Sequence, residues 1–310
     1  MKTTLPFASL ALAPLAIALL SLGACTPSSD TDSSSSASDS ASSESSSVLM
    51  DSAVASFESA SSSSAAAAST ASVAMTDFPH NPAGQLDADT GSGYTDRSNW
   101  APGICFPLAQ TPDYADSQVY DPGGDHYPNH HPTAASPNPA SSQCDAANYS
   151  YPWRDNFCET RDWTNPMCAS GSGHQGQDIR PTTCKANTYW AVAAEDGVIT
   201  QVGSYTVALT GNDTPHRIFR YLHMQIASLK VKVGDHVVRG QRLGLVSNNF
   251  GISNGKQQYT TIHLHFEVRI AQQETLPDGT VLTANTFVPP YTALVDAYQR
   301  KLAGDCPAVQ

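Results

Sequence analysis

Two histidines separated by one residue, His263 and His265, lie in the segment 262–269. Apolar residues alternate there with polar or ionisable ones, and this period of two predicts a half-buried β-strand. Because residues i and i+2 of a strand share a face, the two imidazoles should lie side by side with apolar residues packed behind them. Such a pair suits a metal site, in which one ring binds the ion and the other handles protons. On its own, the pair is equally compatible with a ladder of surface histidines.

A second set of metal-binding residue types lies upstream, in the segment 173–179. His174 offers an imidazole nitrogen and Asp178 a carboxylate oxygen, and Gly176 between them lets the backbone turn tightly enough for both to converge. Together with one histidine of the downstream pair, the ligands would be two nitrogens and one oxygen. Three protein ligands and an open fourth position are typical of catalytic zinc, whereas structural zinc is closed by four.

The residues that must position these side chains read as a mainly β domain. Strand signals dominate from residue 189 onward and are separated by turn residues, without helical patterns between them. Short strands in regular succession predict an antiparallel β-sheet core. One helix is expected near the C-terminus, at residues 292–302, and a long loop at 248–261 leads to the histidine strand. The strands are expected at 190–194, 197–202, 207–210, 217–224, 229–233, 237–238, 243–246 and 262–270.

The first 75 residues are expected to serve export and attachment. Residues 1–25 combine Lys2, an apolar run and small residues, as a secretory signal peptide does. The run ends in a segment, 22–25, that resembles the lipobox of bacterial lipoproteins, which implies cleavage before Cys25 and its acylation as a membrane anchor. An ordinary signal peptide is the alternative. Residues 26–75 are rich in Ser and Ala and are expected to be a disordered tether, spanning roughly 40 Å.

The remaining cysteines indicate disulfides. Seven cysteines are present, and lipidation of Cys25 would leave six, an even number that predicts three bridges in an oxidising compartment. Among the possible pairings we expect Cys168 with Cys184, closing a loop around His174. Residues 76–165 are rich in Pro, Asn, Asp and Gly and are expected to form an irregular, cysteine-containing N-terminal region. The domain that carries the histidines is expected to span residues 166–310.

Charge is distributed unevenly along the chain. The formal net charge is −12, yet residues 170–271 contain ten Lys and Arg against six Asp and Glu. No cluster of basic residues or aromatic stacking motif accompanies this excess, so we expect no nucleic-acid binding. An anionic polymer as substrate is compatible with it.

Several motifs occur in one order between residues 170 and 271: His-x-Gly-x-Asp at 174–178, Tyr-Leu-His at 221–223, Val-Gly-Asp at 233–235 and His-Leu-His-Phe-Glu at 263–267. Together they resemble the lysostaphin/LytM-type zinc endopeptidases of bacterial cell walls. The resemblance implies that His174, Asp178 and His265 bind Zn²⁺ and that His223 and His263 are the catalytic histidines. Which of these two is the general base stays open.

The resemblance implies a zinc-dependent endopeptidase that hydrolyses peptide cross-links of peptidoglycan. The expected bond is D-Ala to meso-diaminopimelate in an envelope with two membranes, or a glycine bridge in a thick wall outside a single membrane. The expected partners are peptidoglycan stem peptides and, through Cys25, the membrane; the chain is expected to be a monomer. The expected location is the outer membrane, facing the periplasm. Two alternatives are a catalytically silent regulator or wall-binding module of the same type, and a secreted protease that acts on proteins.

Overall fold

A computed structural model describes residues 77–124 and 142–310, which lie in one compact unit, Ala68–Gln310. The expected signal peptide and tether lie outside the described residues. Within the described ranges, no helix has the length and apolar character needed to cross a membrane.

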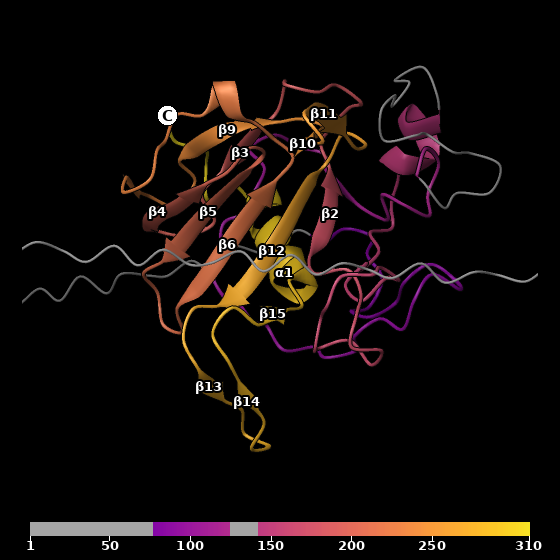
Figure 1. The fold of residues 1–310 in the computed structure, drawn as a ribbon, viewed down its shortest axis with the longest axis vertical. Coiled ribbons are helices and arrows are strands. Elements are labelled where there is room, and N and C mark those ends of the chain that lie inside the picture. The colour runs from indigo at the N-terminus through magenta and orange to yellow at the C-terminus, as the bar shows by residue number, and fades with distance from the viewer. Residues whose placement is uncertain (1–76, 125–141) are drawn as a thin grey trace, which may run out of the picture. The chain divides into compact units, whose positions relative to one another are not determined.

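The main sheet is antiparallel throughout, and its strands follow the order β1-β2-β12-β6-β5-β4-β8, with β15 beside β12. Figure 1 shows the run from β2 through β12, β6 and β5 to β4. This order places β2, β12 and β6, which are far apart in the sequence, next to one another. The strand bounds are β1 Tyr114–Ala115, β2 Gln177–Arg180, β4 Gly197–Val202, β5 Thr206–Gly211, β6 Arg217–Leu222, β8 His236–Val237, β12 Leu264–Ile270 and β15 Phe287–Val288.

Strand β12 has core residues on one face and a predicted site residue on the other. Leu264, Phe266 and Val268 alternate along it and are fully buried in the hydrophobic core, while His265 takes the other face because successive side chains of a strand point to opposite sides. Strand β6 pairs with β12 along its length, whereas β2 pairs only with its first half. The predicted alternation of the histidine strand is therefore present.

The smaller elements complete a mainly antiparallel β fold with a single C-terminal α-helix among the described residues, as predicted. A three-stranded sheet has the order β3-β9-β7, and two hairpins are formed by β10 with β11 and by β13 with β14. The bounds are β3 Trp190–Val192, β7 Met224–Gln225, β9 Arg242–Val246, β10 Asn249–Ser253, β11 Lys256–Tyr259, β13 Glu274–Thr275, β14 Val281–Leu282 and α1 Tyr291–Leu302, with 3-10 helices at Ser142–Cys144, Ala146–Tyr149 and Ile226–Ser228.

Two local predictions are wrong. Residues 229–233 form no strand, because the chain leaves the 3-10 helix at Ile226–Ser228 and runs as a loop with Val231 buried. The long loop expected at 248–261 is largely the hairpin β10-β11. Asn254 and Gly255 both adopt positive φ, 51° and 74°, between the paired residues Ser253 and Lys256. A two-residue Asn-Gly turn with positive φ at both positions is the preferred connection of a β-hairpin.

The irregular N-terminal region packs into the same core as the sheet. Its aromatic side chains surround Tyr298 of α1, with ring centroids 4.8 Å away for Phe78, 4.9 Å for Phe106 and 4.4 Å for Trp153. Trp153 is fully buried. Buried aromatic pairs of this kind contribute about 0.5–1.5 kcal/mol each beyond the area that they bury. The segment around residue 153 is thus anchored firmly against the domain that carries the histidines.

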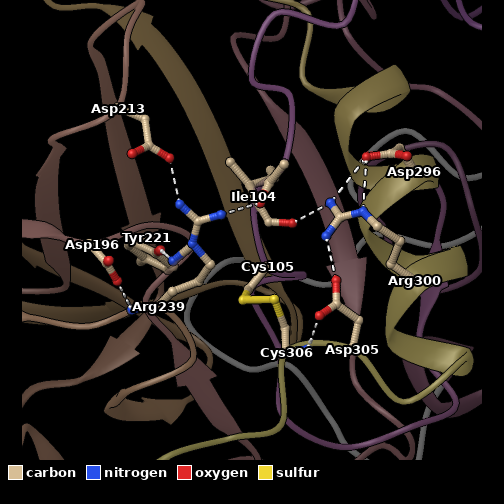
Figure 2. Close-up of a disulfide and its surroundings, with 12 residues drawn as sticks. Ile104, Cys105, Asp196, Asp213, Tyr221, Arg239, Asp296, Arg300, Asp305 and Cys306 are labelled. Carbon is tan, nitrogen blue, oxygen red and sulfur yellow. Dashed lines mark hydrogen bonds and ion pairs between the residues drawn. A yellow bond between two sulfur atoms is a disulfide. The ribbon is translucent and has the colours of Figure 1, made fainter. Parts of the chain in front are cut away.

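The six described cysteines form three disulfides, as expected in number, but the expected pairing of Cys168 with Cys184 is wrong. The bridges are Cys158–Cys168, Cys144–Cys184 and Cys105–Cys306. Cys168 lies in a turn that folds back on Cys158, with the two Cα atoms 5.4 Å apart. Cys184 follows β2 and meets Cys144 at the end of a 3-10 helix instead. Figure 2 shows the third bridge, which ties the C-terminal tail to residue 105.

Candidate metal centre

Three neighbouring strands of the main sheet deliver the five predicted site residues. In the pairing of β2 with β12, Asp178 lies directly opposite His265, and in the pairing of β12 with β6, His265 lies opposite Leu222. His223 follows Leu222, and His263 precedes β12 by one residue. Directly opposed residues of an antiparallel pair share a face and lie within side-chain reach. Sheet order and register therefore bring together residues that are up to 91 positions apart.

The three expected metal ligands converge on one point. Nδ1 of His265 lies 3.0 Å from Oδ1 of Asp178 and 2.9 Å from Nε2 of His174. Nε2 of His174 is 3.3 Å from the same carboxylate oxygen. One ligand atom from each residue lies within 4.8 Å of the others, and all three side chains are buried.

The two remaining histidines lie beside this cluster. Nε2 of His263 is 3.3 Å from Oδ1 of Asp178. The rings of His223 and His263 have centroids 4.4 Å apart, and those of His223 and His265 are 6.3 Å apart. All five residues predicted from the sequence thus gather in one buried place.

Three of these histidines, His174, His263 and His223, each have one ring nitrogen fixed by a backbone carbonyl. A carbonyl oxygen can only accept, so the ring nitrogen facing it must carry the proton. On this rule each of the three rings donates its Nδ1–H to a backbone carbonyl oxygen at 2.9 Å. The pairs are His174 with Asn156 O, His263 with Thr261 O, and His223 with Asn249 O. Nε2 is left available on all three rings. Partners of this kind fix the tautomer and orientation of metal-binding histidines.

His265 is oriented differently from the other three. Its Nδ1 faces the cluster, and its Nε2 lies 3.3 Å from Oε1 of Glu267, an ion-pair distance without hydrogen-bond geometry. Glu267 is buried and is also paired with Arg220 at 2.7 Å and Arg269 at 2.8 Å. The carboxylate of Glu267 therefore lies next to the ring nitrogen of His265 that faces away from the cluster.

Burial and charge set the protonation of the cluster. Burial lowers the pKa of His174 to about 4 and also lowers the pKa of His263 and His223. Burial alone would raise the pKa of Asp178, but His174 and His263 beside it hold it well below its usual range. Burial likewise disfavours the cationic form of His265, yet the carboxylates of Asp178 and Glu267 raise its pKa to about 9.

This donor set fits zinc. Metal ligands must be deprotonated, and the cluster offers a neutral His174 and an ionised Asp178 on its own, leaving the proton of His265 for the metal to displace. Two imidazole nitrogens and one carboxylate oxygen are ligands that zinc binds in proteins, and three protein ligands leave a coordination position for water or substrate.

Gly176 contributes by close approach, not by a special turn. A Cβ atom at this position would lie 2.4 Å from the carbonyl oxygen of Phe266 and 3.0 Å from Nε2 of His265. The glycine therefore lets the chain between His174 and Asp178 lie directly against β12. Gly176 thus helps His174 and Asp178 to converge, as expected, but it does so because it has no Cβ atom and not because of its backbone angles.

His223 has an unusual backbone conformation. Its φ is +64°, in the left-handed region that residues other than glycine rarely adopt. The turn lies between the end of β6 and the start of β7, and it is held by hydrogen bonds from Met224 N to Tyr205 O and from Ser247 N to His223 O. Strained backbone that the surroundings hold in place is concentrated at functional sites.

Sequence reasoning missed two residues next to the cluster. Asn156 contacts both His174 and Asp178 through hydrogen bonds of 2.9 and 2.8 Å. Trp163 is 42% exposed, and its ring centroid lies 6.2 Å from that of His174 and 6.3 Å from that of His265. Both residues come from the irregular N-terminal region, where no periodicity marks them.

Two further histidines between residues 170 and 271 are not part of the cluster. His236 is exposed in β8, and Nδ1 of His216 lies 3.2 Å from the carbonyl oxygen of Gly211.

Comparison with protein families adds a decisive observation. Residues 172–277 match the sequence model of Peptidase family M23. This part of the chain is an M23 peptidase domain. The M23 domain contains all five predicted site residues, whereas Asn156, Trp163 and helix α1 lie outside it.

Solved structures with similarity to the chain include three peptidases. A candidate glycyl-glycine endopeptidase lytM from Ruminococcus gnavus is 24% identical, with a TM-score of 0.32 over 40% of this chain and 47% of that one. A zinc-containing peptidase from Vibrio cholerae is 26% identical, with a TM-score of 0.24 over 32% and 28%. The catalytic domain of lysostaphin from Staphylococcus simulans is 22% identical, with a TM-score of 0.31 over 48% and 93%.

The chain thus spans less than half of the first two of these proteins. No curated protein matches the sequence.

Proposed function

We propose that the chain is a zinc-dependent endopeptidase that hydrolyses peptide cross-links of bacterial peptidoglycan. One observation carries the proposal: within an M23 domain, His174, Asp178 and His265 offer three ligand atoms at one point, with two further histidines beside them. A domain without catalytic activity would not need all three ligands and both further histidines.

In this proposal, Nε2 of His174, Oδ1 of Asp178 and Nδ1 of His265 hold the metal. A bound zinc ion supplies a Lewis acid that polarises the peptide carbonyl and lowers the pKa of a water molecule to about 7. Two of the ligands are oriented by partners on the side away from the metal. The carbonyl oxygen of Asn156 accepts a hydrogen bond from His174, and the carboxylate of Glu267 lies next to His265.

His223 and His263 are the proposed proton carriers. Each donates Nδ1–H to a backbone carbonyl, and burial lowers the pKa of each ring, so both present an unprotonated Nε2 at neutral pH. Such a nitrogen can take a proton from the attacking water and pass it to the leaving amine. The ring that has taken the proton becomes a donor and can stabilise negative charge on the carbonyl oxygen. The two rings are equivalent in these respects, and the pH dependence of His223→Ala and His263→Ala variants would assign the roles.

The proposed substrate is the stem peptide of peptidoglycan, cleaved between D-Ala and meso-diaminopimelate. The proposal rests on the export signal, the lipobox-like segment 22–25 and the Ser- and Ala-rich residues 26–75. A lipid anchor at Cys25 and a long tether would place the peptidase at the outer membrane, facing the periplasm and within reach of an insoluble polymer.

The test is digestion of purified sacculi by the full chain, with mass spectrometry of the fragments released. We expect stem peptides cut at D-Ala–meso-diaminopimelate links and no release by a His265→Ala variant. Casein and an elastin-like polypeptide, digested in parallel, separate a peptidoglycan hydrolase from a protease that acts on proteins. Equal release by the wild type and His265→Ala, or cleavage of the two proteins alone, would contradict the proposal.

A further inference from the structure

Asn156 is a buried asparagine outside the M23 domain that touches two of the three candidate ligands. It is 1% exposed and lies 16 positions before the first residue of the M23 match. A buried amide needs partners for its donors and acceptors, since leaving them unpaired costs about 1–3 kcal/mol. The side-chain amide of Asn156 is hydrogen-bonded to Asp178 and to the carbonyl oxygen of Asp116.

The contacts use both the backbone and the side chain of Asn156. Its carbonyl oxygen accepts Nδ1–H of His174 at 2.9 Å. Its side-chain Nδ2 donates to Oδ2 of Asp178 at 2.8 Å, and its Oδ1 accepts the backbone N–H of Asp178 at 3.2 Å. Its own backbone N–H donates to Oε1 of Gln177 at 3.2 Å.

These contacts select which ligand atoms face the metal. A proton held on Nδ1 of His174 leaves Nε2 as the coordinating nitrogen. A hydrogen bond to Oδ2 of Asp178 leaves Oδ1 as the coordinating oxygen, the atom that lies 3.0 Å from Nδ1 of His265. Both atoms of the Asn156 amide are engaged by Asp178, so the amide acts on a ligand and is not itself a ligand.

The segment that carries Asn156 is fixed independently of the metal. Trp153, three residues earlier, is fully buried and its Nε1 donates to Asp113 O at 2.8 Å. Cys158, two residues later, is bridged to Cys168, and its N–H donates to the carbonyl oxygen of His174 at 3.1 Å. A ligand partner held on both sides costs little further ordering when the metal binds.

We propose that Asn156 is a positioning residue that pre-organises His174 and Asp178 for the metal, so that the irregular N-terminal region completes the metal centre of the M23 domain. The inference rests on metal binding as stated in the proposed function, but not on the identity of the substrate. Loss of an outer partner of a metal ligand typically lowers metal affinity 10–100-fold.

The experiment measures zinc affinity of the full chain by competition with a chromophoric chelator, with the unfolding midpoint of each variant recorded alongside. Asn156→Ala should weaken zinc binding about 10–100-fold. Asn156→Asp keeps the size and the acceptor for Asp178 N–H but sets a second carboxylate against Oδ2, and it should weaken binding at least as much. It also serves as the second variant if Asn156→Ala does not fold.

Asn165→Ala is the matched control. Asn165 is equally buried, and its Nδ2 donates to the backbone carbonyl of His174 at 3.1 Å, not to a coordinating side chain. Its zinc affinity should stay within about threefold of the wild type. Wild-type zinc affinity in a folded Asn156→Ala or Asn156→Asp variant, or an equal loss in Asn165→Ala, would overturn the inference. If the wild type binds zinc but does not digest sacculi, the proposed substrate fails while these affinities still decide the role of Asn156.

Discussion

Asp178 and His265 face each other across the pairing of β2 with β12, with Oδ1 of Asp178 3.0 Å from Nδ1 of His265. The pair links the two halves of the proposed metal centre, since His174 belongs to the β2 side and His263 to the β12 side. Any change that separates these two strands should therefore weaken metal binding before it unfolds the sheet.

Gly176→Ala tests this relationship directly. The new methyl group would lie 2.4 Å from the carbonyl oxygen of Phe266, which is backbone and cannot move aside without shifting β12. We expect a loss of about 1–3 kcal/mol in the free energy of unfolding, together with weaker zinc binding, measured by urea unfolding and chelator competition. Gln175→Ala changes the neighbouring residue and should leave zinc binding intact. Wild-type zinc affinity in Gly176→Ala would show that the close approach does not matter.

Most of the strands and the candidate metal ligands could be predicted because they follow local patterns. The period of two marks β12, and the spacing from His174 to Asp178 marks a ligand pair. Asn156 could not be found in this way, because its contacts join an aperiodic loop to residues 18 and 22 positions away. The disulfide pairing depends on how the chain folds back near Cys158 and Cys144, which spacing does not encode. The hairpin β10-β11 was missed even though Asn254-Gly255 is a hairpin signal, because its strands are poor in β-branched residues.

Two disulfides should have different effects when removed. Cys105–Cys306 closes a loop with a sequence separation of 201 residues, and Arg300 of α1 bridges both of its flanks, through Ile104 O and the carboxylate of Asp305 (Figure 2). By the chain-entropy model, replacing both cysteines by serine should cost about 5 kcal/mol of stability. Zinc affinity of the folded protein should stay unchanged, because neither flank contacts a candidate ligand.

Cys158–Cys168 closes a loop with a sequence separation of only 10 residues, for which the same model gives about 3 kcal/mol. Cys158 lies two residues after Asn156, whose side chain donates to Oδ2 of Asp178, so removal of this bridge should weaken zinc binding as well as stability. Urea unfolding and chelator competition on both double-serine variants measure the contrast. A larger effect on zinc affinity from the 105–306 bridge would contradict it.

The pH dependence of stability should carry the signature of Asp155. Burial raises the pKa of this carboxyl from 3.8 to about 6, although the N–H groups of Gly84 and Phe157 donate to it. The pKa of Asp155 is higher in the folded state than in the unfolded state, so its protonated form favours folding. This contribution to the free energy of unfolding is fully present below about pH 4 and is lost as the pH rises through about 6. It amounts to roughly 3 kcal/mol.

Asp155→Asn removes this titration, and comparison with the wild type cancels the other groups. With zinc chelated, the unfolding free energy of the wild type minus that of Asp155→Asn should decrease between pH 4.5 and 7.5. A difference that is constant or grows over this range would contradict the assignment.

Trp163 should report on metal binding. Its ring lies 6.2 Å from that of His174 and 6.3 Å from that of His265, close enough for Cu²⁺ bound at the cluster to quench its fluorescence. Imidazole and carboxylate ligands bind Cu²⁺ at least as tightly as zinc. One equivalent of Cu²⁺ should quench part of the emission of the four tryptophans. Trp163→Phe should remove most of that quenching and Trp190→Phe should retain it; the reverse pattern would place the ion elsewhere.

The zinc content of the full chain tests the central claim most directly. After loading with zinc and dialysis against metal-free buffer, elemental analysis should find one zinc per chain in the wild type and in His216→Ala, whose side chain lies outside the cluster. His174→Ala, Asp178→Ala and His265→Ala should each retain none. A wild type without zinc, or any of these three variants with a full equivalent, would contradict the account.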